Sequence, residues 1–171
     1  MSPPGDETSE SGTSRPRSII KLVLDEKTFH RRRPEVEHER EVAIFDLLEE
    51  NTFRLNGAGA HPGPYHVQLK LADDRLLLQV KDTDENLIRE VAMAVKPFRM
   101  VIKDYFIVCE SYFDAIKTSS PSQIEAIDMG RRALHNEGAQ MLLERLMVDA
   151  ELDQLTSRRL FTLLCVLHMR G

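Results

Sequence analysis

The stretch from Ser120 to Leu146 places the strongest constraint on how this chain can fold. Ser120 is a favoured N-cap residue, Pro121 suits the first helical turn, and apolar residues then recur at the spacing of one helical face. We therefore predict one long helix over these residues. An alternative is that the residues from Asn136 to Gly138 break it into two helices, because Asn and Gly both favour helix ends.

Two glycines, Gly130 and Gly138, lie on or near the apolar face of this helix. Each costs about 1 kcal/mol in a helix interior relative to alanine. Their placement on one face indicates that another segment of backbone comes close there. We expect bulky aromatic side chains of the 98–116 region to fill the recess that the glycines leave.

Alternation typical of strands dominates the part of the chain before that helix. Apolar and polar residues alternate from Tyr65 to Leu71 and from Arg75 to Lys81, and Leu87 to Val95 continues the pattern. Period-two alternation with short polar turns indicates an antiparallel meander with one buried face. A mostly apolar segment from Ser18 to Asp25 predicts a fourth strand.

Three further helices are predicted from helical periodicity and from prolines at helix starts. They span Pro34 to about Glu50, Pro97 to Lys117, and about Thr156 to His168. The last is apolar on nearly all sides, so we expect it to lie centrally among the others. The broad apolar face predicted for the second helix consists of Phe98, Val101, Ile102, Tyr105, Cys109, Tyr112, Phe113 and Ile116.

These elements predict a single α+β domain over residues 18–171. It should contain a mostly antiparallel sheet of about four strands, one N-terminal helix and a C-terminal group of three helices. Residues 1–17 are rich in Ser, Thr, Pro, Gly and acids. Such a segment cannot bury enough apolar surface to offset its ordering entropy, and we predict a disordered N-terminal tail.

The composition restricts the environment and the classes of partner. A formal net charge of -5 and a pI near 5.7 argue against wholesale binding to nucleic acid or a membrane surface, which usually needs a basic face. The longest dense apolar run, Leu160 to Leu167, is too short to span a bilayer. Cys109 and Cys165 lack metal-binding spacing and indicate buried free thiols in a reducing compartment. We therefore expect a soluble cytoplasmic protein.

Three local motifs suggest ligand binding but lack the residues that would complete a site. The basic run Phe29 to Pro34 could contact phosphate or nucleic acid, yet we favour a solvated connector that faces the acidic helix after it. The glycine-rich loop Arg54 to Pro64 precedes a strand, whereas a phosphate loop precedes a helix. The turn Asp82 to Asn86 mimics the start of a calcium loop, but Leu87 and Met93 occupy the positions of the required glycine and glutamate.

Ionisable and amide side chains gather on one shoulder of the long helix, namely Asp128, Arg131, Arg132, His135, Asn136 and Glu137. Helical spacing allows the carboxylate, guanidinium and imidazole groups of the first four to form one connected polar ladder. Three interpretations stay open. The cluster is a structural salt-bridge network, a surface that binds a protein, or a catalytic or metal site based on His135.

Four segments of the chain carry a resemblance to one family: VAIFDLLEEN, KDYFIVCESYFDAI, SPSQIEAIDMGRRALHNEG and RRLFTLLCVLH. Together they resemble uncharacterised protein family 0262, a group of small alphaproteobacterial proteins, over about residues 19–171. The resemblance implies a bacterial cytoplasmic protein. It supplies no activity, catalytic residue or cofactor that could be assigned to this chain.

The leading functional prediction is a non-enzymatic binding or regulatory module that acts through a protein partner or as a homodimer. It rests on the lack of a nucleophile with a neighbouring base, of a usable phosphate loop and of metal-ligand spacing. One alternative is a small hydrolase or metal-dependent enzyme that uses His135 with Asp128 or Glu137. A second, less favoured, is nucleic-acid binding through the arginines at 31–33 and 158–159. We expect no metal, cofactor or membrane contact, and the sequence leaves open whether a small molecule binds.

Overall fold

The computed structural model describes residues 15–26 and 33–169. Most of the predicted tail (residues 1–14) and part of the predicted basic connector (residues 27–32) lie outside the described residues. Arg15 and Arg17 are attached to the body of the protein. The guanidinium of Arg15 donates to the backbone carbonyls of Leu48 and Glu49, at 2.9 Å each, and the Arg17 carbonyl accepts from the backbone N–H of Phe53.

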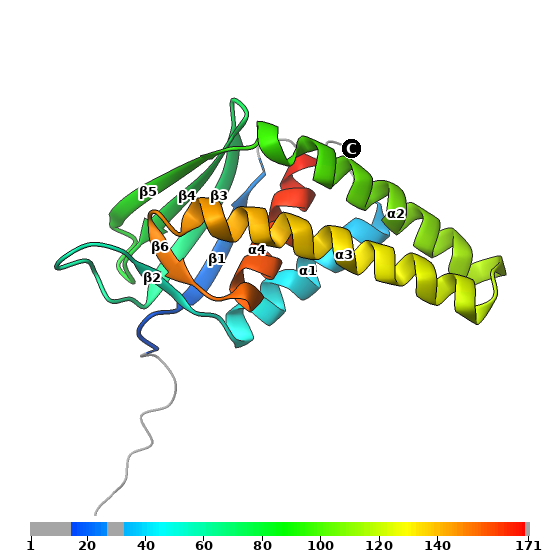
Figure 1. Ribbon diagram of the computed structural model, residues 1–171. Coiled ribbons are helices and arrows are strands. Elements are labelled where there is room, and N and C mark those ends of the chain that lie inside the picture. Colours follow the sequence, from blue (N-terminus) through cyan, green and yellow to red (C-terminus); the bar gives the residue numbers. More distant parts are fainter. Residues whose placement is uncertain (1–14, 27–32, 170–171) are drawn as a thin grey trace, which may run out of the picture.

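A four-stranded sheet forms one side of the molecule (Figure 1). Its strands lie in the order β1 (Ile19–Asp25), β3 (Tyr65–Ala72), β4 (Arg75–Lys81) and β5 (Leu87–Ala94). The last three form the predicted antiparallel meander, whereas β1 runs parallel to β3, so the sheet is mixed. Parallel neighbours need a long connection, and helix α1 (Pro34–Glu49) supplies part of it. The predicted α+β class and four strands are confirmed.

A second, two-stranded sheet was not predicted. β2 (Phe53–Leu55) pairs antiparallel with β6 (Ala150–Leu152), and Arg54 lies opposite Glu151. The segment from Arg54 to Pro64, predicted as a connector throughout, therefore begins inside a strand. Three residues are too few to show alternation, and a pairing between distant segments leaves no local pattern in the sequence.

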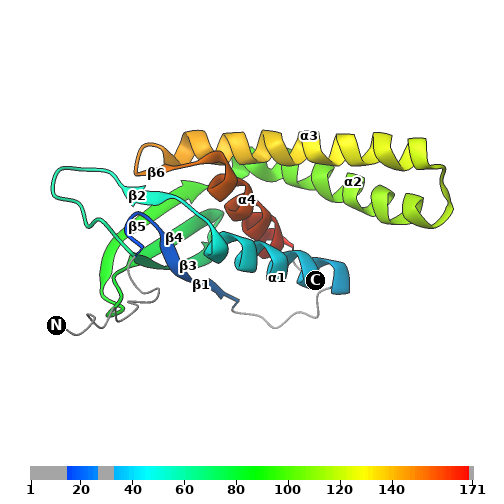
Figure 2. The same cartoon turned by 90° about the horizontal axis from the view of Figure 1, so that it is seen from below.

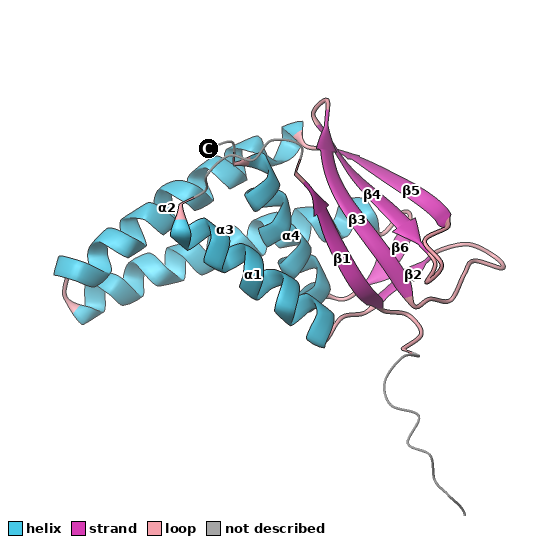
Figure 3. Cartoon of the chain, turned by 180° about the vertical axis from the view of Figure 1, so that it is seen from behind, coloured by secondary structure: helices cyan, strands magenta, loops and turns pink. Residues whose placement is uncertain are grey.

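The helices cover the other side of the molecule (Figures 1 and 3). A 3-10 turn at Lys96–Phe98 leads into α2 (Arg99–Thr118), so the predicted helix starts slightly later than Pro97. α2 and α3 (Pro121–Leu146) pack together as a hairpin that extends away from the sheet. α4 (Gln154–His168) packs against both α1 and α3, and its residues from Leu163 to Val166 are buried. The prediction of a central last helix is confirmed.

No helix within residues 15–26 and 33–169 combines the length and the apolar character needed to cross a membrane.

The apolar core lies between the sheet and the helices. It contains Tyr65 and Leu69 from β3, Leu78 from β4, and Phe98 and Phe161 from the helical side, each no more than 1% exposed.

α3 is a single unbroken helix, so the alternative of a break near Asn136 to Gly138 is wrong. Its start is fixed by a capping box. The Ser120 hydroxyl accepts from the backbone N–H of Gln123, and the Gln123 side chain accepts from the backbone N–H of Ser120. Such reciprocal bonds satisfy two N–H groups that a helix start otherwise leaves unpaired.

The two glycines of α3 differ in their surroundings. A Cβ atom added at Gly138 would lie 2.1 Å from Cζ of Phe161, whereas one at Gly130 would meet nothing within 4 Å. The predicted close approach therefore exists at Gly138 only. The prediction that α2 supplies the aromatic residue is wrong, because Phe161 belongs to α4.

The apolar face of α2 is buried along only part of its length. Val101, Tyr105 and Cys109 are at most 7% exposed, as predicted. Phe113 is 38% exposed and Ile116 is 51% exposed, so the apolar face predicted from the sequence is not buried over its whole length. The outer end of the α2–α3 hairpin extends beyond α4 (Figure 2), so α4 does not cover the outer end of α2.

Candidate functional site

A groove separates α1 from the α2–α3 hairpin, and α4 contributes to its floor. Three adjoining cavities of about 370, 420 and 500 Å³ make up this groove. The first and second share Cys109 and Phe113 in their linings, and the second and third share Glu39 and Arg131. The three cavities therefore adjoin one another along the groove.

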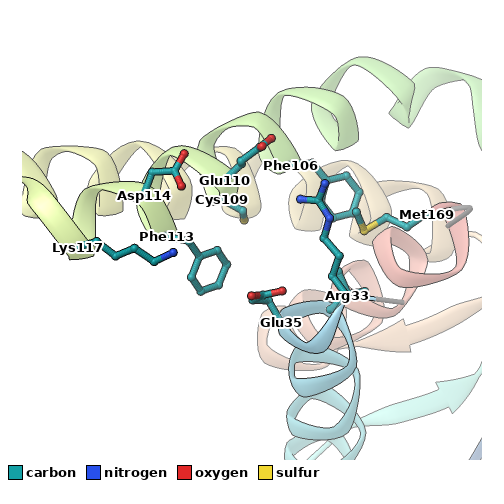
Figure 4. Close-up of a pocket in the computed structure, with 10 residues that line it drawn as sticks. Arg33, Glu35, Phe106, Cys109, Glu110, Phe113, Asp114, Lys117 and Met169 are labelled. Carbon is teal, nitrogen blue, oxygen red and sulfur yellow. The ribbon is translucent and has the colours of Figure 1, made fainter. Parts of the chain in front are cut away.

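One end of the groove is mainly apolar. Phe106 and Phe113 of α2 line it together with Met169, which follows α4. Figure 4 shows Arg33 and Glu35, at the start of α1, on the side opposite these α2 side chains. The apolar surface is thus bordered by charges of both signs. We call this part the apolar end of the groove.

Cys109 lies in the wall between the first two cavities and is 7% exposed. Burial, followed by the charge of Glu39, raises the pKa of the Cys109 thiol to about 11. The thiolate is the nucleophilic form of cysteine, and it is scarcely populated at neutral pH here. The thiol is suited to packing, in line with the interpretation drawn from the sequence.

The third cavity, of about 500 Å³, is lined from all four helices and carries four arginines. Arg131 and Arg132 come from α3, and Arg158 and Arg159 come from α4. Glu39 of α1 is the one carboxylate that lines it among the described residues. We call this cavity the arginine pocket. It contains most of the polar cluster predicted from the sequence.

Asp128 organises the α3 side of the arginine pocket. Its Oδ1 accepts from the guanidinium of Arg131 at 2.6 Å, and its Oδ2 lies 2.9 Å from Nη2 of Arg132. The Arg131 guanidinium also lies 5.1 Å from the centre of the Tyr112 ring, in a cation–π contact. The hydrogen bond from Arg131 lowers the pKa of Asp128. The carboxylate–guanidinium part of the predicted ladder is therefore present.

His135 lies apart from that carboxylate and contacts α4. Its Nε2 is 2.8 Å from the Thr162 hydroxyl oxygen, and its ring lies 5.4 Å from the ring of Tyr105 and 5.3 Å from that of Phe161. The imidazole is thus held by a hydroxyl and by two aromatic rings. The predicted connection from Asp128 through arginine to His135 is not made by hydrogen bonds.

The electrostatic surroundings of His135 favour its neutral form. Burial, followed by the positive charges of Arg158, Arg131 and Arg159, lowers the pKa of His135 to about 4. A neutral imidazole at pH 7 can accept or donate one hydrogen bond at each ring nitrogen, depending on its tautomer. Glu39 has a raised pKa, because burial outweighs the opposing influence of Arg131 and His38.

The remaining predicted residues divide between the pocket and the surface. Asn136 lines the arginine pocket, whereas Glu137 is exposed and lines none of the three cavities. No group of three or more His, Cys, Asp or Glu side chains within residues 15–26 and 33–169 has an arrangement that could hold a metal ion.

The sequence did not predict that the Arg131–Arg132 pair of α3 and the Arg158–Arg159 pair of α4 line the same cavity. For Arg158 and Arg159 the sequence suggests only a nucleic-acid contact, together with the arginines at 31–33. In the structure they line the same pocket as Arg131 and Arg132. The repeated Arg-Arg pair was the available signal, but nothing in the sequence shows that α3 and α4 pack face to face. Glu39 carried no signal, because it is one of several acids in α1.

The comparisons with known proteins confirm the resemblance found in the sequence. The model of the Uncharacterised protein family (UPF0262) matches residues 16–170. A UPF0262 protein of Rhodospirillum rubrum is 57% identical over 153 residues, which cover 90% of this chain and 93% of that protein. UPF0262 proteins of Paramagnetospirillum magneticum and Agrobacterium fabrum are 56% and 52% identical, again over 90% of this chain and over 96% of each relative.

No solved structure matches the chain. The match to the family model covers nearly the whole length of the chain, and the relatives align over nearly all of theirs. The chain therefore belongs to the uncharacterised protein family UPF0262, whose members come mostly from alphaproteobacteria.

Proposed function

We propose that this protein is a non-enzymatic, cytoplasmic binding module that holds a segment of a protein partner in the groove between α1 and the α2–α3 hairpin. The observation that carries the proposal is the row of adjoining cavities in that groove. Cavities that share lining residues lead from the apolar end to the arginine pocket. A partner segment lying along it would bury apolar side chains and satisfy charges in a single contact.

The lining of the groove defines the chemistry of the partner segment. Phe106 and Phe113 offer apolar surface, and Phe113 remains 38% exposed in the protein alone. Arg132, whose side chain is 66% exposed, adds positive charge at the other end. The complementary segment carries large apolar residues at one end and acidic residues at the other. Charge complementarity of this kind speeds association and selects the register of binding.

The cysteines support the proposed cytoplasmic compartment. Cys109 and Cys165 are both free and buried. Cysteines that persist as free thiols are typical of the reducing cytoplasm. This supports a partner that is also cytoplasmic.

Site-specific photo-crosslinking in cells tests the groove directly. A photoreactive amino acid is placed at Phe113, inside the groove, or at Met129 of α3, which is 64% exposed and lines none of the three cavities. We expect one discrete crosslinked polypeptide from position 113 and none from position 129. The polypeptide is then purified and its binding to this protein is measured by calorimetry.

The calorimetric measurement includes matched variants. Phe113→Asp should weaken binding by about tenfold or more, because it places a charge on apolar contact surface, while Met129→Asp should leave the affinity unchanged. An Arg131→Glu/Arg132→Glu variant should weaken binding as well. Full affinity in both groove variants would overturn the proposal. A crosslink between two copies of this chain, together with a dimer in sedimentation analysis, would identify the partner as a second copy.

A further inference from the structure

The arginine pocket contains guanidinium groups whose hydrogen-bonding capacity is not used within the protein. Arg158 forms no side-chain hydrogen bond or ion pair with any residue of the described chain. Arg159 lies 3.4 Å from Asp46, but its Nε–H is buried and has no acceptor among the described residues. A buried N–H group without an acceptor is unfavourable, and an oxygen atom placed within hydrogen-bond distance would satisfy it.

The carboxylates around the pocket do not neutralise it. Asp128 is occupied by Arg131 and Arg132, and Asp46 lies beside Arg159, so no carboxylate of the described residues forms an ion pair with Arg158. The third carboxylate, Glu39, has a raised pKa because of its burial and therefore gives up its charge more readily than an exposed glutamate. Positive charge from both helices thus remains in excess within a partly enclosed space.

The size and the remaining lining fit a small molecule. A cavity of about 500 Å³ lies in the range of about 300–1,000 Å³ that is typical of small-molecule sites. Beside the arginines it presents the Thr162 hydroxyl, the His135 imidazole and the Asn136 amide, which can bond neutral polar groups. Val42 and Ala43 give one wall an apolar surface, so the pocket suits a ligand with one anionic end.

We propose that the arginine pocket binds a small phosphorylated molecule, with Arg158 and Arg159 holding the oxygen atoms of its phosphoryl group. Two neighbouring guanidinium groups offer more donors than the two oxygens of a carboxylate can engage. A phosphoryl group has three acceptor oxygens and about two negative charges, and arginine binds it through paired N–H donors. This inference does not depend on the protein partner proposed above, because it assigns the phosphoryl group to Arg158 and Arg159 of α4, whereas the partner proposal is tested at Arg131 and Arg132 of α3, and its experiment contains no partner.

Titration of the purified full-length protein tests the proposal. The probes are inorganic phosphate, pyrophosphate and adenosine monophosphate at low ionic strength, followed by calorimetry and by amide chemical shifts. We expect saturable binding of at least one probe. Arg158→Gln should weaken it by about tenfold, since one charge-assisted contact is lost. Arg145→Gln, an exposed arginine of α3 that lines none of the groove cavities, should bind like the wild type.

Each outcome separates the sources of the phosphoryl group. Equal binding of inorganic phosphate and adenosine monophosphate assigns recognition to the phosphoryl group alone, and tighter binding of the nucleotide assigns it to an organic phosphate. Because Arg158 makes no ion pair with the described residues, Arg158→Gln should fold normally, and a Tm equal to that of the wild type checks this. No saturable binding of any probe, or equal weakening by Arg158→Gln and Arg145→Gln, overturns the proposal.

Discussion

Because Gly138 of α3 contacts Phe161 of α4, whereas a Cβ atom added at Gly130 would meet nothing within 4 Å, replacing each glycine by alanine should have opposite effects on stability. In Gly138→Ala the new Cβ would lie 2.1, 2.3 and 2.6 Å from three atoms of the Phe161 ring. Carbon atoms attract best at about 3.5–4.0 Å, so the ring must move by more than 1 Å. It has little room, because Phe161 is 0% exposed and lies against the rings of Tyr105 and His135.

The magnitude follows from two terms of opposite sign. Overpacking a tight core costs about 1–3 kcal/mol, and this overlap belongs at the upper end of that range. Alanine gains about 1 kcal/mol over glycine through its helix propensity. Gly138→Ala should therefore lower the free energy of unfolding by about 2 kcal/mol. Gly130→Ala meets nothing within 4 Å, so it should raise stability by about 1 kcal/mol.

Urea unfolding followed by far-ultraviolet circular dichroism measures both variants. A Gly138→Ala/Phe161→Leu double variant supplies the internal check, because the shorter side chain removes the ring atoms that the new methyl group meets. Its loss of stability should be smaller than the sum of the two single losses by about 1 kcal/mol or more. If Gly138→Ala is as stable as Gly130→Ala, the close approach of α3 and α4 is not as described.

Three further predictions follow from the contacts of single side chains. The pKa of His135 in the folded protein is about 4, below the ordinary value of 6.5, so the unfolded chain takes up a proton first as the pH falls. Between pH 7.5 and 5 the free energy of unfolding of the wild type should therefore fall by up to about 2 kcal/mol more than that of His135→Gln. If the two proteins lose stability equally over this range, the prediction is wrong. Asn51→Ala removes three hydrogen bonds to the backbone of Ile19 and Leu47 and should cost about 2–3 kcal/mol in urea unfolding, whereas a loss below 1 kcal/mol would count against these bonds. Ser157→Ala removes a buried 2.6 Å bond to a carbonyl of α3 and should cost about 1 kcal/mol, with the thermal midpoint as the readout.

The elements that the sequence predicted well are those whose signal is local. Tyr65 to Leu71 and Arg75 to Lys81 alternate because each strand has one buried face, and the structure buries the apolar residues of that face except Leu71, which is half-buried. The start of α3 was predictable because Ser120 and Pro121 are themselves the capping and first-turn residues. In these cases the residues that define the element also carry its pattern.

The features that sequence reasoning missed depend on which surfaces meet. The position of Gly138 on the apolar face of α3 predicts a close approach at that face. The spacing does not show which helix packs there, so the sequence favours the aromatic residues of α2, whereas the neighbour is Phe161 of α4. The parallel pairing of β1 with β3 was missed for a similar reason. The apolar pattern of a strand does not show whether its neighbour runs parallel or antiparallel to it. The arginine pocket arises because Arg131 and Arg158, far apart in the sequence, line one cavity. Its charge excess cannot be read from either pair alone.

The partial burial of the apolar face of α2 bears on the function of the groove. Its apolar face continues in the sequence from Phe98 to Ile116, as if one buried surface ran the length of the helix. The domain covers only the first part, because α4 lies under that part and the hairpin extends past it. Phe113 is left lining an open groove beside Cys109. The outer part of the apolar face of α2 stays partly exposed, although it continues the part that the fold buries. A bound segment would bury this exposed apolar surface. The mismatch between pattern and burial therefore supports the groove as the place of contact, independently of its charges.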